Sequence, residues 1–301
     1  MAETPARKPD WLKVKAPAAG AFRATGAVLE ELRLHTVCDE ARCPNKGECF
    51  SARTAAFLIL GDVCTRRCRF CAVEHVQPGP TEVEARAHPR LCALDPDEPA
   101  RLAEAAVRLG LMHVVVTSVT RDDLADGGAG RFAAAIRDLR AALPAATVEV
   151  LIPDFGGDRA ALDCVLAERP AVLGHNLETV PRLYSRVRPQ ATYERSLELL
   201  GRAAAVTPRP LVKTGLMVGL GETPGEVRAV LADCARARVG VVTIGQYLQP
   251  DSGCLPVARY VEPEEFAGLE NDGAQLGLQV VAGPLVRSSY HAAEVFSADL
   301  R

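Results

Sequence analysis

Short, mostly apolar runs recur along the chain from residue 55 onward, and most are followed by a longer stretch with helical periodicity. An apolar run of four to eight residues without alternation is typical of a strand that is buried on both faces. Strands that alternate with helices predict a parallel sheet with helices outside it. The predicted strands are 55–60, 113–118, 147–152, 171–175, 211–218, 240–246 and 278–282, and the predicted helices are 99–109, 131–142, 158–168, 193–205 and 224–237.

Polar residues lie at or just beyond the ends of five of these predicted strands. Both open parallel sheets and barrels place their sites at the carboxyl ends of strands, and periodicity alone does not separate the two folds. A ring of polar residues from five strands fits the lumen of a barrel better than a crevice. We therefore expect an α/β fold with a full or partial barrel. The polar residues are Thr117, Ser118, Asp154, His175, Asn176, Glu178, Lys213, Thr214 and Gln246.

Two extensions flank the predicted barrel. We expect an N-terminal arm over residues 1–50, the barrel over residues 51–250 and a C-terminal extension over residues 251–301. With 301 residues, 48% of them hydrophobic, the chain is large enough to bury one main core. The net charge of -3 gives no basic footprint, so neither nucleic acid nor a membrane surface is an expected partner. No apolar run reaches about 18 residues, and residues 1–15 lack the apolar core of a signal peptide, so we expect a cytoplasmic protein.

Six of the ten cysteines fall in two triplets. Thiolates at such short spacings can converge on one soft metal centre, as in iron–sulfur loops. A structural zinc site closes with four ligands, whereas three cysteines on a [4Fe–4S] cluster leave one of its four irons open. Zinc at the second triplet is the alternative interpretation. Clustering in a long chain makes disulfides improbable. The triplets are Cys38, Cys43 and Cys49 (C-x4-C-x5-C), then Cys64, Cys68 and Cys71 (C-x3-C-x2-C).

The second triplet, in the segment GDVCTRRCRFC directly after a predicted strand, resembles the cluster loop of radical S-adenosylmethionine (SAM) enzymes. The first triplet, in TVCDEARCPNKGEC, and the C-terminal RSSYHA narrow this resemblance to the lipoyl synthase family. The resemblance covers nearly the whole chain, and the fold that it implies is a partial (β/α)6 TIM-type barrel. Further similar segments are VTSVTRDDLADGGAGRFA, VEVLIPDFGG, GHNLETVPRLYSRVRP, KTGLMVGLGE and TIGQYLQP.

The resemblance implies two [4Fe–4S] clusters and SAM as cofactors. Cys64, Cys68 and Cys71 would bind the radical cluster, whose open iron SAM chelates, so that one electron releases a 5′-deoxyadenosyl radical. The implied reaction is insertion of two sulfur atoms, at C6 and C8 of an octanoyl chain on a lysine of a lipoyl carrier domain. Two SAM molecules would be consumed per product. The C–H bonds at these positions have no acidic proton, so a carbon radical that abstracts hydrogen can break them whereas acid–base catalysis cannot.

An auxiliary cluster at the first triplet is also implied, and it would donate both sulfurs. Its ligands would be Cys38, Cys43, Cys49 and a serine of the RSSY segment. By position we assign Ser289, with Ser288 as the alternative. An oxygen ligand on iron is weaker than thiolate, so a serine would favour breakdown of the cluster.

Contacts to SAM are expected from Asn176, Glu178, Arg188 and Lys213, because a ribose diol and a carboxylate need such donors and acceptors. For Arg188 and Lys213 the alternative is a surface ion pair or a helix cap, because long cationic side chains are usually solvated. Implied partners are the octanoylated lipoyl domains of 2-oxoacid dehydrogenase E2 subunits and the glycine cleavage H protein. Flavodoxin or ferredoxin is the implied electron donor.

One residue departs from the resemblance, since Cys254 stands where we expect a histidine after QYLQP. We assign no ligand role to it. Three competing interpretations are left open by the residues: another sulfur-inserting or dehydrogenating radical enzyme, a non-catalytic iron–sulfur electron carrier, and a zinc-binding interaction module.

Overall fold

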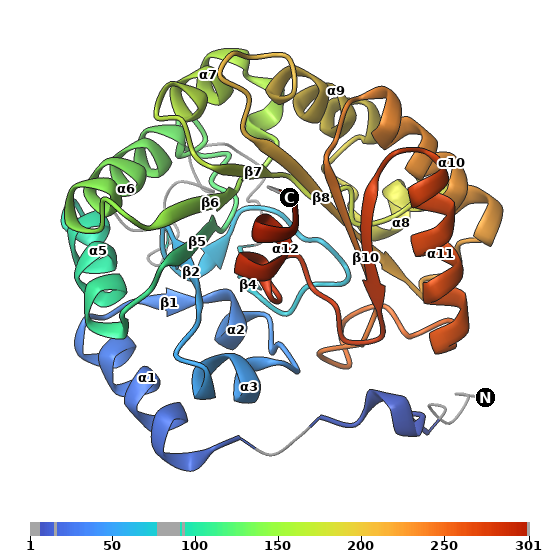
Figure 1. Ribbon diagram of the computed structural model, residues 1–301, viewed down its shortest axis with the longest axis horizontal. Coiled ribbons are helices and arrows are strands. Elements are labelled where there is room, and N and C mark those ends of the chain that lie inside the picture. The colour runs from blue at the N-terminus through green and yellow to red at the C-terminus, as the bar shows by residue number, and fades with distance from the viewer. Residues whose placement is uncertain (1–6, 15–16, 77–90, 92–93, 300–301) are drawn as a thin grey trace.

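The computed structural model describes residues 7–14, 17–76, 91 and 94–299. Its centre is an eight-stranded sheet in the order β1-β2-β5-β6-β7-β8-β9-β10, parallel from β2 to β10, with β1 antiparallel at one edge (Figure 1). A separate two-stranded sheet pairs β3 with β4. The strands are β1 (His35–Thr36), β2 (Ala56–Ile59), β3 (Val63–Cys64), β4 (Glu74–His75), β5 (His113–Ser118), β6 (Thr147–Leu151), β7 (Val172–Gly174), β8 (Leu211–Val218), β9 (Val241–Gln246) and β10 (Gln279–Gly283).

Helices cover the outside of the curved sheet, as Figure 1 shows for α5, α6, α7, α9, α10 and α11. The expected partial TIM-type barrel is confirmed, and the five predicted helices agree with α5, α6, α7, α9 and α10 within two residues at each end. The helices are α1 (Ala19–Glu31), α2 (Val37–Glu40), α3 (Lys46–Ser51), α5 (Glu98–Leu109), α6 (Ala129–Ala142), α7 (Arg159–Ala167), α8 (Tyr184–Val187), α9 (Tyr193–Ala203), α10 (Pro224–Arg236), α11 (Pro263–Gln275) and α12 (Ala292–Asp299), with short 3-10 turns at Asp10–Leu12, Phe155–Gly157 and Pro181–Leu183.

Local sequence explains where several of these helices begin and end. Thr223 caps α10 reciprocally with Glu226, and Pro224 takes the first helical position, where its missing N–H costs nothing. Gly110 ends α5 in the left-handed conformation. The strands are apolar because both faces are covered, and all six residues of β9 are buried. No helix in the described ranges has the length and apolar character needed to cross a bilayer.

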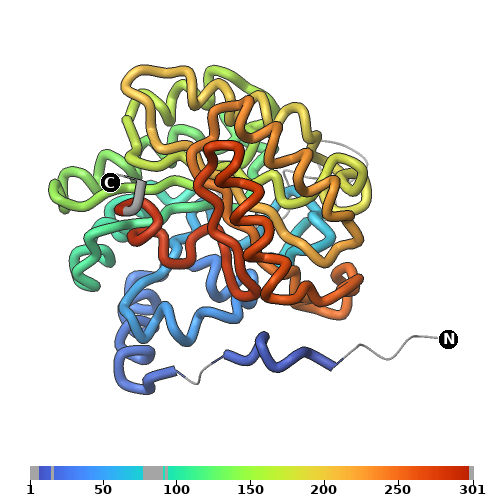
Figure 2. Tube along the Cα trace, turned by 45° about the vertical axis from the view of Figure 1, so that its right-hand side comes forward, coloured from blue at the N-terminus to red at the C-terminus, as the bar shows by residue number. Residues whose placement is uncertain are grey.

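The predicted C-terminal extension contributes to the sheet itself. β10 pairs in parallel with β9, so the last strand of the barrel lies within residues 251–301. The following helix, α12, lies over the middle of the barrel in Figure 1, and Figure 2 shows it beside the strands from a second direction. The ring of Phe296 lies 5.8 Å from that of His113, the first residue of β5. Helix α12 therefore covers the amino ends of the strands.

The segment between β10 and α12 packs against the sheet at two glycines. A Cβ on Gly245 of β9 would overlap the carbonyl oxygen of Val286. A Cβ on Gly215 of β8 would lie 2.5 Å from Oγ of Ser288. Neither contact leaves room for a side chain, and the neighbour at Gly245 is backbone, which cannot swing away. These two glycines therefore admit residues 286–288 to the inside of the barrel.

Replacing Gly245 by alanine should displace this segment. We expect Gly245→Ala to lower the free energy of unfolding by about 1–3 kcal/mol, the usual cost of overpacking. The matched control is Gly268→Ala in α11, where an added Cβ meets nothing. That change should raise stability by about 0.5–1 kcal/mol, because glycine weakens a helix interior. Denaturant unfolding of both variants checks this, and equal effects would contradict the packing explanation.

Candidate functional site

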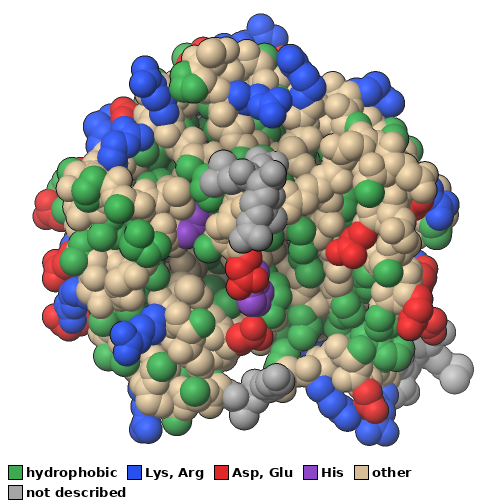
Figure 3. Space-filling view, viewed as in Figure 1, with side chains coloured by type: hydrophobic (Ala, Val, Ile, Leu, Met, Phe, Trp, Pro, Cys, Tyr) green, Lys and Arg blue, Asp and Glu red, His purple; other side chains and the backbone are tan. Residues whose placement is uncertain are grey.

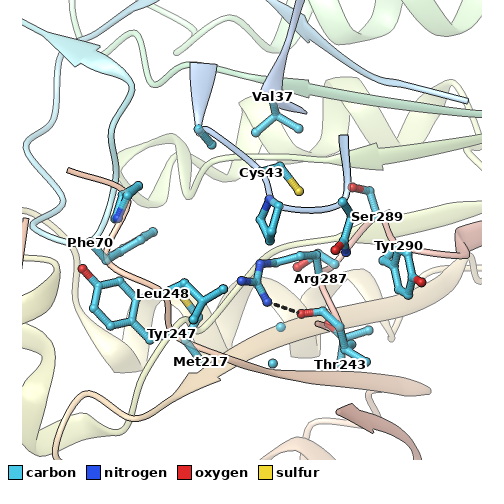
Figure 4. Close-up of a pocket in the computed structure, with 18 of the residues that line it drawn as sticks. Val37, Cys43, Phe70, Met217, Thr243, Tyr247, Leu248, Arg287, Ser289 and Tyr290 are labelled. Atoms are coloured by element: carbon cyan, nitrogen blue, oxygen red, sulfur yellow. Dashed lines mark hydrogen bonds between the residues drawn. The ribbon is translucent and has the colours of Figure 1, made fainter. Parts of the chain in front are cut away.

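One pocket of about 360 Å³ joins parts of the chain that are far apart in sequence. Figure 4 shows Cys43 and Ser289 toward one side of it and Phe70 and Tyr247 toward the other, with the guanidinium of Arg287 between them. The walls come from the loop of the first triplet, the ends of β7 to β9 and the segment after β10. The cysteines and serines that line the pocket are Cys38, Cys43, Cys49, Cys71, Ser288 and Ser289.

The first triplet is carried by two short helices and the turn between them. Cys38 lies on α2, which the side chain of Thr36 caps by accepting from the N–H of Asp39, and Cys49 lies on α3. Burial raises the pKa of Cys38 to about 12, and the nearby thiols of Cys43 and Cys49 add to the rise. This mutual influence shows that the three sulfurs converge. A thiolate ligand here would need the positive charge of bound iron.

The second triplet lies in the loop after β2. Burial raises the pKa of Cys68 to about 11, and the neighbouring thiol of Cys64 raises it further. Burial also raises the pKa of Cys71, with Cys68 and Cys64 contributing. The N–H of Arg66 lies 3.4 Å from Sγ of Cys64. These three thiols converge as well, so each triplet fits a shared metal group.

A single metal ion fits the site less well than a cluster. Across the ranges that the structure describes, no three His, Cys, Asp or Glu side chains are grouped to hold one ion. A zinc ion needs all its ligands within about 2.0–2.3 Å of one point. A cluster of several irons spaces its ligands farther apart, which suits thiols that are close neighbours without meeting at a point. This geometry does not favour the zinc alternative.

A buried ion network fixes the loop of the second triplet. Arg66, between Cys64 and Cys68, donates two hydrogen bonds of 2.7 Å to Asp122 and lies 2.7 Å from Oδ1 of Asp154. Burial alone would raise the pKa of Asp154, but the hydrogen bond and charge of Arg66 outweigh it and hold this pKa well below its usual range. Breaking such a pair leaves buried charge uncompensated. Arg66 is therefore an anchor that sequence analysis missed.

Asn176 and Glu178 follow β7 and line the pocket, as expected. Glu178 has φ +66, a left-handed conformation that is uncommon outside glycine and is often found at functional sites. Its carboxylate accepts from Nδ2 of Asn176 at 3.1 Å, and burial raises its pKa. Oδ1 of Asn176 accepts from the hydroxyl of Ser288 at 2.9 Å. These two side chains form the polar part of the wall.

Arg188 is buried beside the second triplet, where its charge lowers the pKa of Cys68. One terminal nitrogen donates to the carbonyl of Asn176 at 2.7 Å, while its Nε has no partner. Two other buried side-chain oxygens in the described residues also lack partners, Oγ of Ser118 and Oγ1 of Thr179. Ser118 ends β5, Thr179 follows β7 and Arg188 follows α8. An unsatisfied buried polar atom costs about 1–3 kcal/mol, so a polar ligand would be stabilised by bonding to any of them.

Our expectation for Lys213 is wrong. Lys213 is the third residue of β8, near its amino end, and does not line the pocket. Its Nζ lies 2.9 Å from Oε1 of the buried Glu149, whose other oxygen is 3.1 Å from Nε2 of His113. Lys213 therefore belongs to a buried ion pair below the site, which is not the surface pair or helix cap that we left open as the alternative.

The two serines of the RSSY segment face different groups. The hydroxyl of Ser288 is engaged with Asn176, on the side of the second triplet. Ser289 lines the main pocket and also a neighbouring one of about 180 Å³, which it shares with Cys38 and Cys49. This arrangement favours Ser289 over Ser288 as a partner of the first triplet.

Two further features complete the site. Arg287, part of the quoted RSSY segment but given no role from sequence, is close enough to Cys43 and Glu178 to interact with both. Cys254 lies beside the second triplet, with its Sγ 3.4 Å from the carbonyl of Cys71. In the sequence, only the position of Arg287 next to the two serines could have indicated that it lies in the site.

Residues 58–234 match the family model of the radical SAM superfamily, and residues 2–43 match the N-terminal domain of lipoyl synthase. Lipoyl synthase from Nitratidesulfovibrio vulgaris is 54% identical over 295 residues, which cover 97% of this chain and 93% of that protein. Those from Caldanaerobacter subterraneus and Chlorobium limicola are 54% and 51% identical, covering 95% and 97% of this chain and 96% of each relative. The chain belongs to the lipoyl synthase family.

Solved structures support the fold. Methylornithine synthase superposes with a TM-score of 0.51 at 14% identity, covering 90% of this chain and 80% of that one. SuiB of Streptococcus suis bound to SAM gives 0.55 at 9% identity, covering 79% and 54%. Membership of the family makes the chain an enzyme of the radical SAM type, with a [4Fe–4S] cluster and SAM. The carrier, zinc-module and other radical-enzyme interpretations are thereby superseded.

The Arg66 network can be tested by stability. We expect Arg66→Gln to lower the free energy of unfolding of the metal-free protein by about 3–5 kcal/mol, because two carboxylates lose their buried partner. Arg202→Gln, which breaks an exposed pair with Asp163, should cost about 0–1 kcal/mol. Since Asp154 has a depressed pKa when folded, its contribution is present above the ordinary carboxyl pKa and is lost as pH falls below it. The difference between wild type and Arg66→Gln should therefore shrink in acid, and a pH-independent difference would contradict this.

Proposed function

We propose that this lipoyl synthase inserts two sulfur atoms at C6 and C8 of an octanoyl group carried on a lysine of a lipoyl domain, with an auxiliary [4Fe–4S] cluster as the sulfur donor. The observation that carries the proposal is the single pocket shared by cysteines of both triplets and by Ser289. A reaction that needs both a radical and a sulfur source requires the two to meet one substrate. A pocket with both at its wall supports that arrangement.

Cys64, Cys68 and Cys71 would hold the radical cluster, and a cluster with SAM bound supplies a 5′-deoxyadenosyl radical. Around it, this chain offers groups suited to an amino acid and a ribose. The unpartnered Nε of Arg188 can donate to a carboxylate, and the carboxylate of Glu178 can accept from an ammonium or a hydroxyl. The Arg66 network would keep the loop in place while the pocket fills.

Cys38, Cys43, Cys49 and Ser289 would hold the auxiliary cluster on the opposite side of the pocket. A hydroxyl is a poorer iron ligand than a thiolate and is a suitable group to leave first. Ser289 lies next to this triplet through two adjoining pockets, which supports its selection over Ser288. Arg287 extends its cation into the space between the two groups.

Apolar side chains line the pocket where an octanoyl chain would pass. Each methylene buried there contributes about 0.8 kcal/mol to binding, and no charged partner is needed along the chain. Recognition of the carrier itself would then rest on the protein surface around the opening. The apolar lining includes Val37, Phe70, Leu216, Met217 and Leu248.

We further propose octanoylated lipoyl domains of 2-oxoacid dehydrogenase E2 subunits and the glycine cleavage H protein as substrates, flavodoxin or ferredoxin as the reductant and the cytoplasm as the compartment. These assignments rest on family resemblance. Lys and Arg side chains lie mainly around the rim of the face in Figure 3, and acidic side chains lie both at the rim and near the centre.

Single cysteine variants should separate the two halves of the reaction. With reduced protein, SAM and an octanoyl-lysyl peptide, Cys68→Ala should lose formation of 5′-deoxyadenosine by at least about 100-fold, because inner-sphere reduction of SAM requires the radical cluster. Cys43→Ala should still form 5′-deoxyadenosine but give no product with two sulfurs. Mass spectrometry of the peptide and chromatography of the nucleoside measure both.

The wild-type protein is the control, with about two 5′-deoxyadenosines per doubly sulfurated peptide expected from the proposed stoichiometry. Should Cys43→Ala produce lipoyl peptide at the wild-type rate, the first triplet would not hold the sulfur donor. Cleavage of SAM by wild type without any change to the peptide would remove the substrate assignment.

A further inference from the structure

The segment that carries Ser289 is hydrogen-bonded to the loop of the first triplet on both sides of the serine. On one side, Nδ2 of Asn45 donates to the carbonyl oxygen of Leu285 at 2.7 Å. On the other, the hydroxyl of Tyr290 donates to Oε1 of Glu48 at 3.0 Å. Nε2 of His291 is 3.4 Å from the same carboxylate oxygen. Both Asn45 and Glu48 lie between Cys43 and Cys49, so the cysteine loop itself holds the serine segment.

The side chain of Asn45 makes a hydrogen bond that is unusual for a residue at the start of a helix. It is the N-cap residue of α3, where an asparagine side chain ordinarily accepts from the first N–H groups of its own helix. Its side chain makes no such capping bond. The amide instead reaches the backbone of residue 285, and Asn45 is only 3% exposed. The Asn45 side chain therefore contacts a residue 240 positions away in the sequence and does not cap its own helix. This contact points to a role in placing the C-terminal segment.

The tie at Glu48 is weaker than the one at Asn45. The side chain of Glu48 is 57% exposed and that of His291 is 41% exposed, so water screens their attraction. The Asn45 donor is shielded from water and would be left unsatisfied if the segment moved away, which makes its bond the more costly one to break. Gly245 and Gly215 limit movement on the opposite side of the same segment.

We propose that Asn45 is a positioning residue that holds the 285–289 segment, and with it the hydroxyl of Ser289, against the first triplet. This inference rests on the proposed role of Ser289 as the fourth ligand of the auxiliary cluster. Asn45 touches no reacting atom. It sets how long the serine stays at the iron, because a weak ligand that is held in place rebinds before the cluster opens.

Asn45→Asp tests this directly. Aspartate keeps the shape and is an equally good N-cap, but an ionised carboxylate cannot donate to the carbonyl of Leu285. In the reconstituted full-length enzyme, iron loss to an added chelator is followed without SAM. The phase that belongs to the auxiliary cluster is identified as the one that Ser289→Ala accelerates. We expect Asn45→Asp to accelerate the same phase roughly two- to tenfold, the factor that one neutral hydrogen bond contributes.

The second phase of iron loss, and 5′-deoxyadenosine formation, should not change in Asn45→Asp. Glu48→Gln is the matched control in the same loop: it keeps an oxygen that can accept from Tyr290, and iron loss should stay within about twofold of wild type. The unfolding midpoint of the cluster-free Asn45→Asp protein should fall below that of wild type, because a buried side chain loses its bond to Leu285, so the informative result is which phase of iron loss changes.

Two results would overturn the proposal for Asn45 while leaving the proposed role of Ser289 intact. One is Asn45→Asp releasing iron at the wild-type rate while Ser289→Ala releases it faster. The other is Asn45→Asp accelerating both phases equally, which would mean general destabilisation and no specific effect on the serine segment. If Ser289→Ala itself changes neither phase, the assignment of Ser289 as a ligand falls, and the role of Asn45 falls with it.

Discussion

The site depends on close packing between the chain's last segment and the inside of the barrel. Residues 286–288 lie against β8 and β9 at positions where only glycine leaves room, and the stretch around them hydrogen-bonds to the loop of the first triplet. Through these contacts, residues near position 45 and residues near position 289 form one wall. Helix α12 follows and covers the amino ends of the strands. Without this insertion, the first triplet would line an open surface instead of a pocket.

Two kinds of stabilisation meet in the pocket. On the side of the second triplet, buried ions hold the loop: Arg66 is compensated by Asp122 and Asp154, and Arg188 lies near Cys68. On the side of the first triplet, the contacts are a neutral hydrogen bond at Asn45, a solvent-screened contact at Glu48 and packing, which are cheaper to break. This difference suits a radical cluster that is retained and an auxiliary cluster that is proposed to be consumed. Raised thiol pKa values on both sides mean that bound iron has to stabilise the thiolates.

Much of this could be read from the sequence because it depends on local pattern. Buried parallel strands are continuous apolar runs, and the helices between them are amphipathic. The strands β2 and β5 to β10 and the helices α5, α6, α7, α9 and α10 were therefore predicted closely, whereas the short β3, β4 and α8 were not predicted. Cysteine spacing identified both triplets. Lys213 was misplaced because a polar residue in a strand was taken to lie at the carboxyl end, whereas it pairs with Glu149 near the amino end. Arg66 and Asn45 could not have been found, since their partners lie 56 to 240 residues away and are brought close only by the tertiary fold.

The central claim is that one pocket joins a radical site to a sulfur source. Its most direct test traces labelled sulfur from the protein into the product. The protein is reconstituted with ³⁴S-labelled sulfide, freed of excess sulfide, and given one turnover with SAM, reductant and an octanoyl-lysyl peptide. If the first triplet holds the donor, mass spectrometry will find both sulfurs of the product labelled, and Cys43→Ala protein loaded in the same way will give no labelled product. A product with unlabelled sulfur, with the label still on the protein, would contradict a sulfur-donating cluster at this wall.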